Sequence, residues 1–186
     1  MGRSPAARDR RRHPRAPLIH PDMADELEGI HVAGPVRAEI FLVWLDADRI
    51  ALTGPDGARP WLVQLDDLEH PVETVARIVR GVVGEPLLVH STSWRRDGAA
   101  VLLSFLVVIA PDQVGEMDSA PIRRAQLARS EVARAPAAIG GSQVLEHALR
   151  HLAWLAEDDP VVAARLGPEW TAALAGYVPE PFRSFA

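Results

Sequence analysis

The chain contains no cysteine, no lysine and no asparagine among its 186 residues. The absence of cysteine excludes disulfides, thiolate zinc sites and a cysteine nucleophile. Lysine and asparagine both use A-rich codons, and all 20 basic residues are arginine. This pattern is typical of a GC-rich bacterial genome such as that of an actinobacterium. We therefore interpret the arginines as a codon bias, and not as a selection of arginine for binding phosphate.

The sequence also lacks an apolar run long enough to cross a bilayer. The longest such run, residues 101–111, is interrupted by Ser104 and predicts a buried strand. No apolar segment of the kind found in secretory signals follows the basic start of the chain. We therefore expect a cytoplasmic protein that has no membrane partner.

Composition favours one globular α/β domain with a sizeable core, because 48% of the residues are hydrophobic and 24% are charged. Residues 1–22 are rich in arginine and proline and predict a disordered arm, or a segment that is not native if translation starts at Met23. We expect the main domain to span residues 23–158. Residues 159–186 are expected to form a helical extension and an aromatic tail that pack on it.

Charge is distributed unevenly along the chain. Residues 1–22 hold six arginines and two aspartates, a net charge of +4, so the remaining residues must carry −9 to give the chain total of −5. Affinity for duplexes comes largely from cationic contacts to phosphates, which an acidic body disfavours. A nucleic-acid partner is therefore not expected.

The best-defined element is an amphipathic helix between Pro71 and Gly84. Its apolar positions follow a 3.6-residue period, at Val72, Val75, Ala76, Val79, Val82 and Val83. Pro71 suits the first helical position, and Gly84 suits the position just after the last turn. The opposite face carries polar residues, namely Glu73, Thr74, Arg77 and Arg80.

The other elements are predicted from periodicity and turn signals. Strands are predicted over residues 37–45, 49–53, 61–65, 86–92 and 99–109. Turns are predicted at residues 46–48 and 95–98, and an acidic loop at residues 111–121. Further helices are predicted over residues 122–135, 143–156, 160–166 and 168–174. The strand at 99–109 is the most hydrophobic and is expected inside the sheet.

This order of elements, together with a partial motif, resembles the Nudix hydrolase family. The family's box reads G-x5-E-x7-R-E-U-x-E-E-x-G-U, where U is an aliphatic residue. When the last glycine of the box is placed on Gly84, the pattern is also matched by Glu69, Arg77 and Val79. The resemblance covers about residues 36–156. It implies a Nudix-like α/β/α sandwich with a mixed sheet, to which the C-terminal helices are an addition.

The same alignment shows that the box is degenerate. Ile78 stands where the pattern has a glutamate after the arginine, and Gly81 and Val82 stand at its paired glutamates. Family members hydrolyse nucleoside diphosphates linked to another group, using Mg²⁺ or Mn²⁺ held chiefly by those glutamates. We therefore expect no cofactor, and Mg²⁺ or Mn²⁺ only if the chain is active.

Three functions remain open. We favour a Nudix-fold protein without hydrolase activity that binds a nucleotide-like metabolite or a protein partner. The alternative from the enzyme class is a divergent Mg²⁺- or Mn²⁺-dependent pyrophosphohydrolase. The candidate catalytic residues of this enzyme are Glu69, Glu73 and Arg77. Glu69 and Glu73 are also its candidate metal ligands. Further carboxylates could come from Glu116 or Asp118. The third is an interaction module in which the C-terminal helices and aromatic tail dock a partner or a second copy, as in a homodimer.

Four histidines suggest a metal or acid–base role, namely His70, His90, His147 and His151. His147 and His151 are four residues apart in one predicted helix, a spacing that can bind zinc. The stretch HALRH lacks the glutamate that a metalloprotease uses as its base. We therefore interpret both as solvated residues on a helix face.

Overall fold

The computed structural model describes residues 35–55, 57, 59–65, 70–125 and 139–178. All of them belong to one unit, residues 34–186. The arm at 1–22, Glu69 and most of the helix predicted over 122–135 lie outside the described residues. Residues 122–125, the part of that predicted helix that is described, are not helical. No described helix is long and apolar enough to cross a membrane.

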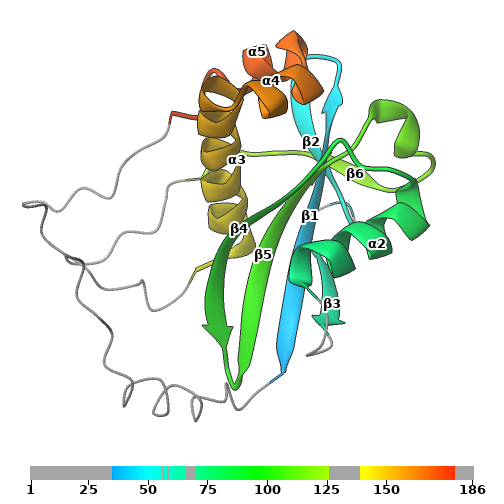
Figure 1. Cartoon of the computed structure of the whole chain (residues 1–186), viewed down its shortest axis with the longest axis vertical. Helices are drawn as coiled ribbons and strands as arrows, with labels where there is room; N and C mark the ends of the chain where they lie inside the picture. The colour runs from blue at the N-terminus through cyan, green and yellow to red at the C-terminus, as the bar shows by residue number, and fades with distance from the viewer. Residues whose placement is uncertain (1–34, 56, 58, 66–69, 126–138, 179–186) are drawn as a thin grey trace, which may run out of the picture. The chain divides into compact units, whose positions relative to one another are not determined.

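Strand β1 (Val36–Asp46) has neighbours along both of its edges in a six-stranded mixed sheet (Figure 1). It pairs in parallel with β5 (Ala100–Val108) along one edge. On the other edge, its first half pairs with β3 (Trp61–Leu65) and its second half pairs with β2 (Arg49–Thr53), both antiparallel. The predicted strands at 37–45, 49–53 and 61–65 are confirmed, and β5 lies inside the sheet as its hydrophobicity predicted.

The outer strands are β4 (Leu88–Asp97) and β6 (Ser119–Pro121), which gives the order β4-β5-β1-β2-β6. The β4–β5 ladder continues to the pair Asp97↔Ala100, so the hairpin loop is shorter than the predicted turn at 95–98. The predicted loop at 111–121 contains the 3₁₀ helix η1 (Pro111–Gln113) and β6. Elements of three residues are too short to show a hydrophobic period, and sequence analysis missed both for this reason.

Helix α2 (Pro71–Val83) covers one face of the sheet (Figure 1). Its inward stripe is centred on Val75 and Val79, which are buried against residues of β1 and β5. Two assignments of the helical wheel were wrong. Val82 was expected to face inward and is 56% exposed, and Thr74 was expected on the polar face and is buried. The buried stripe therefore includes Thr74 and excludes Val82, while Val83 of the last turn is half-buried and packs against the same cluster.

Helix α3 (Gly141–Asp158) covers the opposite face (Figure 1). Leu149 and Leu152 are fully buried in a cluster with residues of β1, β2 and β5. The short helices α4 (Pro160–Leu166) and α5 (Pro168–Leu174) pack on α3 and add to the same cluster. The predicted α/β/α sandwich with a mixed sheet and extra C-terminal helices is confirmed.

The helix starts show which capping predictions hold. Asp159 caps α4 as expected, because its Oδ1 accepts a hydrogen bond from the Val161 N–H at 2.8 Å. α3 begins earlier than the predicted start after Ser142. Its N-cap is Gly140, whose N–H donates to the side-chain oxygen of Gln143 at 3.0 Å.

A buried carboxylate ties α3 to two other parts of the chain. Glu146 is 1% exposed. It accepts hydrogen bonds from Arg124 at 2.8 Å and from Arg150 at 2.9 Å. Arg124 also lies over the ring of Tyr177, 4.1 Å from its centroid, and donates to the carbonyl of Gly176 at 2.7 Å. The residues that follow β6 and α5 are therefore both fastened to α3.

We predict that Glu146→Gln destabilises the protein by about 2 kcal/mol, because it removes the buried negative charge to which Arg124 and Arg150 both donate hydrogen bonds. Burial raises the pKa of Glu146, but the hydrogen bonds from Arg124 and Arg150 outweigh this effect and hold the pKa below 4.5. The charge of Glu146 therefore stabilises the fold above pH 4.5, and this contribution is lost as the pH falls below that value. Urea unfolding of both proteins from about pH 7 to about pH 4 measures the difference.

Glu157→Gln provides the control, since Glu157 is exposed on the same helix. This variant should cost less than about 0.5 kcal/mol. Equal losses in the two variants would contradict a stabilising role for the Glu146 network.

Candidate functional site

The described positions that were aligned with the box pattern lie along α2 and just beyond it. Glu73 and Arg77 are both exposed and one turn apart on the helix. Gly81 and Val82 lie in its last turn and are also exposed. A Cβ atom at Gly81 would meet no other heavy atom within 4 Å. The positions where the family pattern has its paired glutamates therefore have room for longer side chains, and here they carry none that can bind a cation.

The carboxylates proposed as recruited ligands lie elsewhere. Glu116 and Asp118 are exposed in the segment between η1 and β6. Among the described residues, no three histidine or acidic side chains are arranged so that they could hold a metal ion. The described part of the chain thus does not join Glu73 with Glu116 and Asp118 into a metal cluster.

The glycine that matches the end of the box has a structural role. Gly84 has φ +89°, a left-handed conformation that favours glycine, and its N–H donates to the carbonyl of Arg80 at 3.1 Å. The side chain of Gln113 donates to the carbonyls of Val83 and Glu85, both at 2.9 Å. These bonds fasten the end of α2 to the segment that follows β5. Part of the sequence match to the box therefore reflects helix termination.

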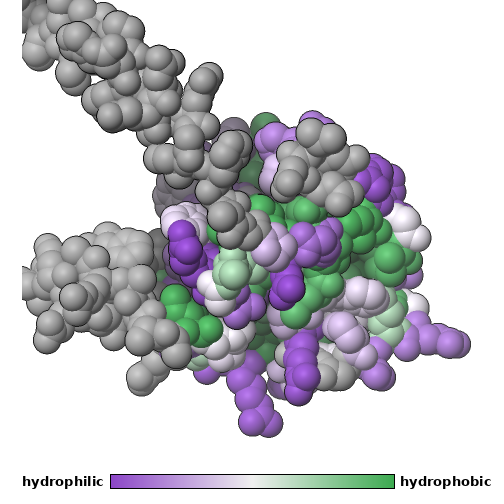
Figure 2. Space-filling model, turned by 90° about the horizontal axis from the view of Figure 1, so that it is seen from below, coloured by the Kyte–Doolittle hydropathy of each residue, from purple (hydrophilic) through white to green (hydrophobic). Residues whose placement is uncertain are grey.

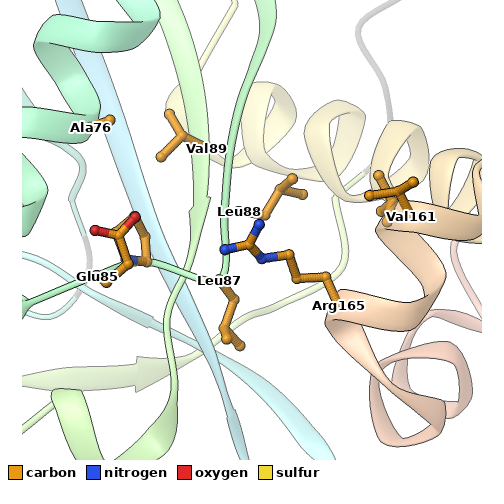
Figure 3. Close-up of a pocket in the computed structure, with 9 residues that line it drawn as sticks. Ala76, Glu85, Leu87, Leu88, Val89, Val161 and Arg165 are labelled. Atoms are coloured by element: carbon orange, nitrogen blue, oxygen red, sulfur yellow. The ribbon is translucent and has the colours of Figure 1, made fainter.

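Beside this end of α2 is a small pocket of about 220 Å³ (Figure 3). Val161 and Arg165 of α4 line one side, and Leu88 and Val89 of β4 line another. Glu85 is also at the pocket and pairs with Arg80, whose hydrogen bond lowers the pKa of Glu85. The pocket is small and open, and the one carboxylate among its described lining residues is already paired.

A larger pocket, about 940 Å³, lies on the α3 side of the sheet. This volume falls in the range of small-molecule sites. Its apolar walls include buried side chains from strands and helix, namely Phe41, Leu52, Leu102 and Leu145. Figure 2 views the molecule from the end at which the β4–β5 hairpin points, and apolar surface is visible there between hydrophilic residues.

Arg95 is fixed in this pocket by a buried carboxylate. Glu39, in the first half of β1, is 1% exposed. Arg95 Nη2 donates to one oxygen of Glu39 at 2.7 Å, and Nη1 donates to the other oxygen. The hydroxyl of Ser104 donates to Glu39 at 2.5 Å. The hydrogen bonds to Glu39 raise the pKa of Arg95, so the guanidinium stays charged.

The described lining of the larger pocket is positively charged although the chain is acidic overall. Among the described residues that line it, four are arginines, Arg59, Arg95, Arg96 and Arg123, and two are carboxylates, Glu39 and Asp97. These six residues carry +2, whereas the whole chain carries −5. Arg96 and Arg123 are exposed, and neither forms an ion pair within the described residues. The pocket therefore combines apolar walls with cations that can hold an anion.

Sequence analysis did not single out this pocket. Arg95 and Arg96 were assigned to a hairpin turn, and Glu39 was treated as part of an apolar strand. One signal was present, because Glu39 is the only acidic residue within the otherwise apolar stretch from Ala38 to Leu45. A lone charge at an inward position requires a partner. Its partners, Arg95 and Ser104, are 56 and 65 residues away.

The histidines are more closely packed than expected. His70 is exposed at the start of α2. His147 and His151 were interpreted as solvated, but both are only partly exposed. His151 contacts His90 of β4, with 3.0 Å between His90 Nε2 and His151 Nδ1. The cause is that β4 packs against α3, a tertiary contact that helical spacing alone does not reveal.

No protein-family model matches the chain, and no curated protein matches it. Among solved structures, the chain is similar to a MutT/nudix family protein from Enterococcus faecalis, with a TM-score of 0.50 and 14% sequence identity. The match covers 88% of this chain and 82% of that chain. The fold is Nudix-like. At this identity the similarity concerns the arrangement of strands and helices, which confirms the fold expected from the resemblance.

We predict that Arg95→Met destabilises the Nudix-like domain by about 3 kcal/mol, because Glu39 would remain buried without a counter-charge. Urea unfolding measures the effect. Arg96→Met is the matched control, since Arg96 is exposed on the same strand, and it should cost less than about 0.5 kcal/mol. The double variant Glu39→Leu/Arg95→Met should regain part of the loss, because it removes both charges. Equal stability of the two single variants would contradict the prediction.

Proposed function

We propose that this chain is a Nudix-fold binding protein without hydrolase activity, and that its ligand is an anionic, nucleotide-like metabolite. The observation that carries the proposal is the 940 Å³ pocket between the sheet and the start of α3, with its positive lining and apolar walls. A nucleotide-like molecule joins a flat, weakly polar group to a phosphate. The two kinds of lining match those two parts.

In this proposal the phosphate contacts the arginines at the rim. A guanidinium presents paired N–H groups that match the oxygens of phosphate, and such charge-assisted hydrogen bonds are stronger than neutral ones. Arg96 and Arg123 are the candidate contacts, and Arg95 adds charge at the wall. The weakly polar group of the ligand packs against Phe41 and Leu102, which are buried walls of the same pocket.

The residues at the box positions support the absence of hydrolysis. Magnesium and manganese need several oxygen ligands, mostly carboxylates, and Gly81 and Val82 provide no side-chain oxygen. The alternative of a divergent pyrophosphohydrolase is supported by the Nudix-like fold and by Glu73 and Arg77, which are both exposed on α2. In that case Glu69 and Glu73 would be the first candidates to hold Mg²⁺ or Mn²⁺.

The binding proposal is tested by isothermal titration with ADP and ADP-ribose as nucleotide probes and inorganic phosphate as the minimal anion. We expect ADP or ADP-ribose to bind more tightly than phosphate. Arg96→Ala and Arg123→Ala should each weaken binding about tenfold, the loss of roughly 1.4 kcal/mol for one charge-assisted contact. Arg49→Ala is the control, since Arg49 is exposed at the start of β2 and is not among the residues that line the pocket. Equal affinities in all variants, or no binding of any probe, would refute the assigned pocket.

Hydrolysis is tested separately, by phosphate or nucleotide release from nucleoside diphosphate derivatives with Mg²⁺ or Mn²⁺. We expect no turnover. The variant Gly81→Glu/Val82→Glu adds two carboxylates at exposed positions and should gain Mn²⁺ binding, whereas Gly81→Gln/Val82→Gln should not, because amides carry no charge. The enzyme alternative would be established if the unmodified protein turned over a substrate and the Glu69→Gln variant did not.

Homodimer formation is a further prediction, and light scattering during size-exclusion chromatography tests it.

A further inference from the structure

Two histidines from different elements face each other across the junction between β4 and α3. His90 Nε2 and His151 Nδ1 are 3.0 Å apart, and the ring centroids are 4.9 Å apart. The pair is partly buried. At this distance one ring nitrogen donates its proton and the other accepts it, so the contact needs at least one ring with a free lone pair.

The described surroundings of the pair are aromatic and cationic. On α3, His147 stacks on His151 with 6.4 Å between centroids, and Trp154 also stacks on His151, at 5.5 Å and 2° between planes. Arg150 is the cation whose charge acts on His147. Within the described ranges, no carboxylate forms an ion pair with any of these histidines. A second proton on the pair would therefore have no described counter-charge.

We propose that His90 and His151 form a pH-sensitive latch between strand β4 and helix α3. The latch is closed when one proton lies between the two rings. It opens when both rings are protonated, because two N–H groups and two positive charges then face each other at hydrogen-bond distance. Protonation of the neutral pair takes up a first proton and keeps the hydrogen bond, since one ring still accepts. Opening of the singly protonated pair then takes up a second proton from solvent and breaks this hydrogen bond.

The direction of the titration agrees with this geometry. Burial, and then the neighbouring charge of His151, lower the pKa of His90 below 6.5. Burial, followed by the charges of His151 and Arg150, lowers the pKa of His147 as well. The unfolded chain therefore binds protons more readily than the folded one. Stability is full above about pH 6.5 and is lost as the pH falls below it.

The latch joins the two elements that also bound the larger pocket. β4 contributes Arg95 and α3 contributes Leu145 to its lining. An open latch would let α3 shift relative to β4 and change the width of the pocket. This consequence rests on the proposed function, whereas the latch itself does not.

The test uses the full chain and compares it with His90→Gln and His151→Gln. Each glutamine can keep a hydrogen bond to the remaining histidine but cannot take up a proton. Urea unfolding is measured from about pH 7.5 to about pH 5. We expect the unfolding equilibrium constant of the unmodified protein to rise up to about tenfold more per pH unit than that of either variant, the effect of one additional linked proton. His70→Gln, at an exposed histidine on α2, should follow the unmodified protein.

NMR titration of the histidine ring nitrogens gives an independent readout. A closed latch predicts that the titration of the His90 ring changes when its partner is replaced in His151→Gln protein. The same His90 titration in unmodified and His151→Gln protein, or parallel pH profiles of unfolding in unmodified and His90→Gln protein, would overturn the proposal.

Titration with ADP at about pH 7.5 and about pH 5.5 tests the proposed latch and the proposed ligand pocket independently. Weaker ADP binding at the lower pH that His90→Gln suppresses would support their coupling. If the unfolding and NMR results establish the latch while ADP binds at neither pH, the proposed function is refuted and the latch stands. Binding of ADP with the same affinity at both pH values would overturn the coupling.

Discussion

The parallel pairing of β1 with β5 is the constraint on which the rest of the structure depends. It places both strands in the interior of the sheet, and strands buried on both faces need a layer of helices on each side. α2 supplies one layer through Val75 and Val79, and α3 supplies the other through Leu149 and Leu152. The two layers use different parts of the chain, so they place different chemistry on the two faces of the sheet.

That separation explains how a helix can match a family motif in part and lack its carboxylates. α2 is held in the fold by its inward valines and ended by a glycine. Neither feature depends on the residues on the outward side of the helix. Gly81 and Val82 are exposed, so substitutions there change little in the packing of the core. The larger pocket lies on the opposite side of the sheet, against α3. The residues at positions 81 and 82 therefore do not affect the lining of that pocket.

The sequence predicted the parts of the fold that local patterns determine. The bounds of β2 and α5, and the cap of α4 by Asp159, follow from alternation, proline and capping rules that act within a few residues. The pocket could not be predicted in this way, because Glu39 meets Arg95 only after β1, β4 and β5 have paired. The meeting of His90 with His151 was missed for the same reason. Tertiary pairing decides which charged or titratable groups meet. The spacing of residues within a single sequence does not reveal these contacts.

The Glu146 cluster has a consequence for the order in which the chain assembles. Its carboxylate lies on α3, but Arg124 joins it to Gly176, which follows α5 in sequence. A nascent chain synthesised only as far as α3 would have the sheet and the carboxylate, but it would lack Tyr177 and the carbonyl that orient Arg124. The apolar cluster on that side would also lack Trp170 and Leu174. We therefore expect docking of the last two helices to come late in folding, and a ribosome-bound intermediate without them to expose the surface that chaperones recognise.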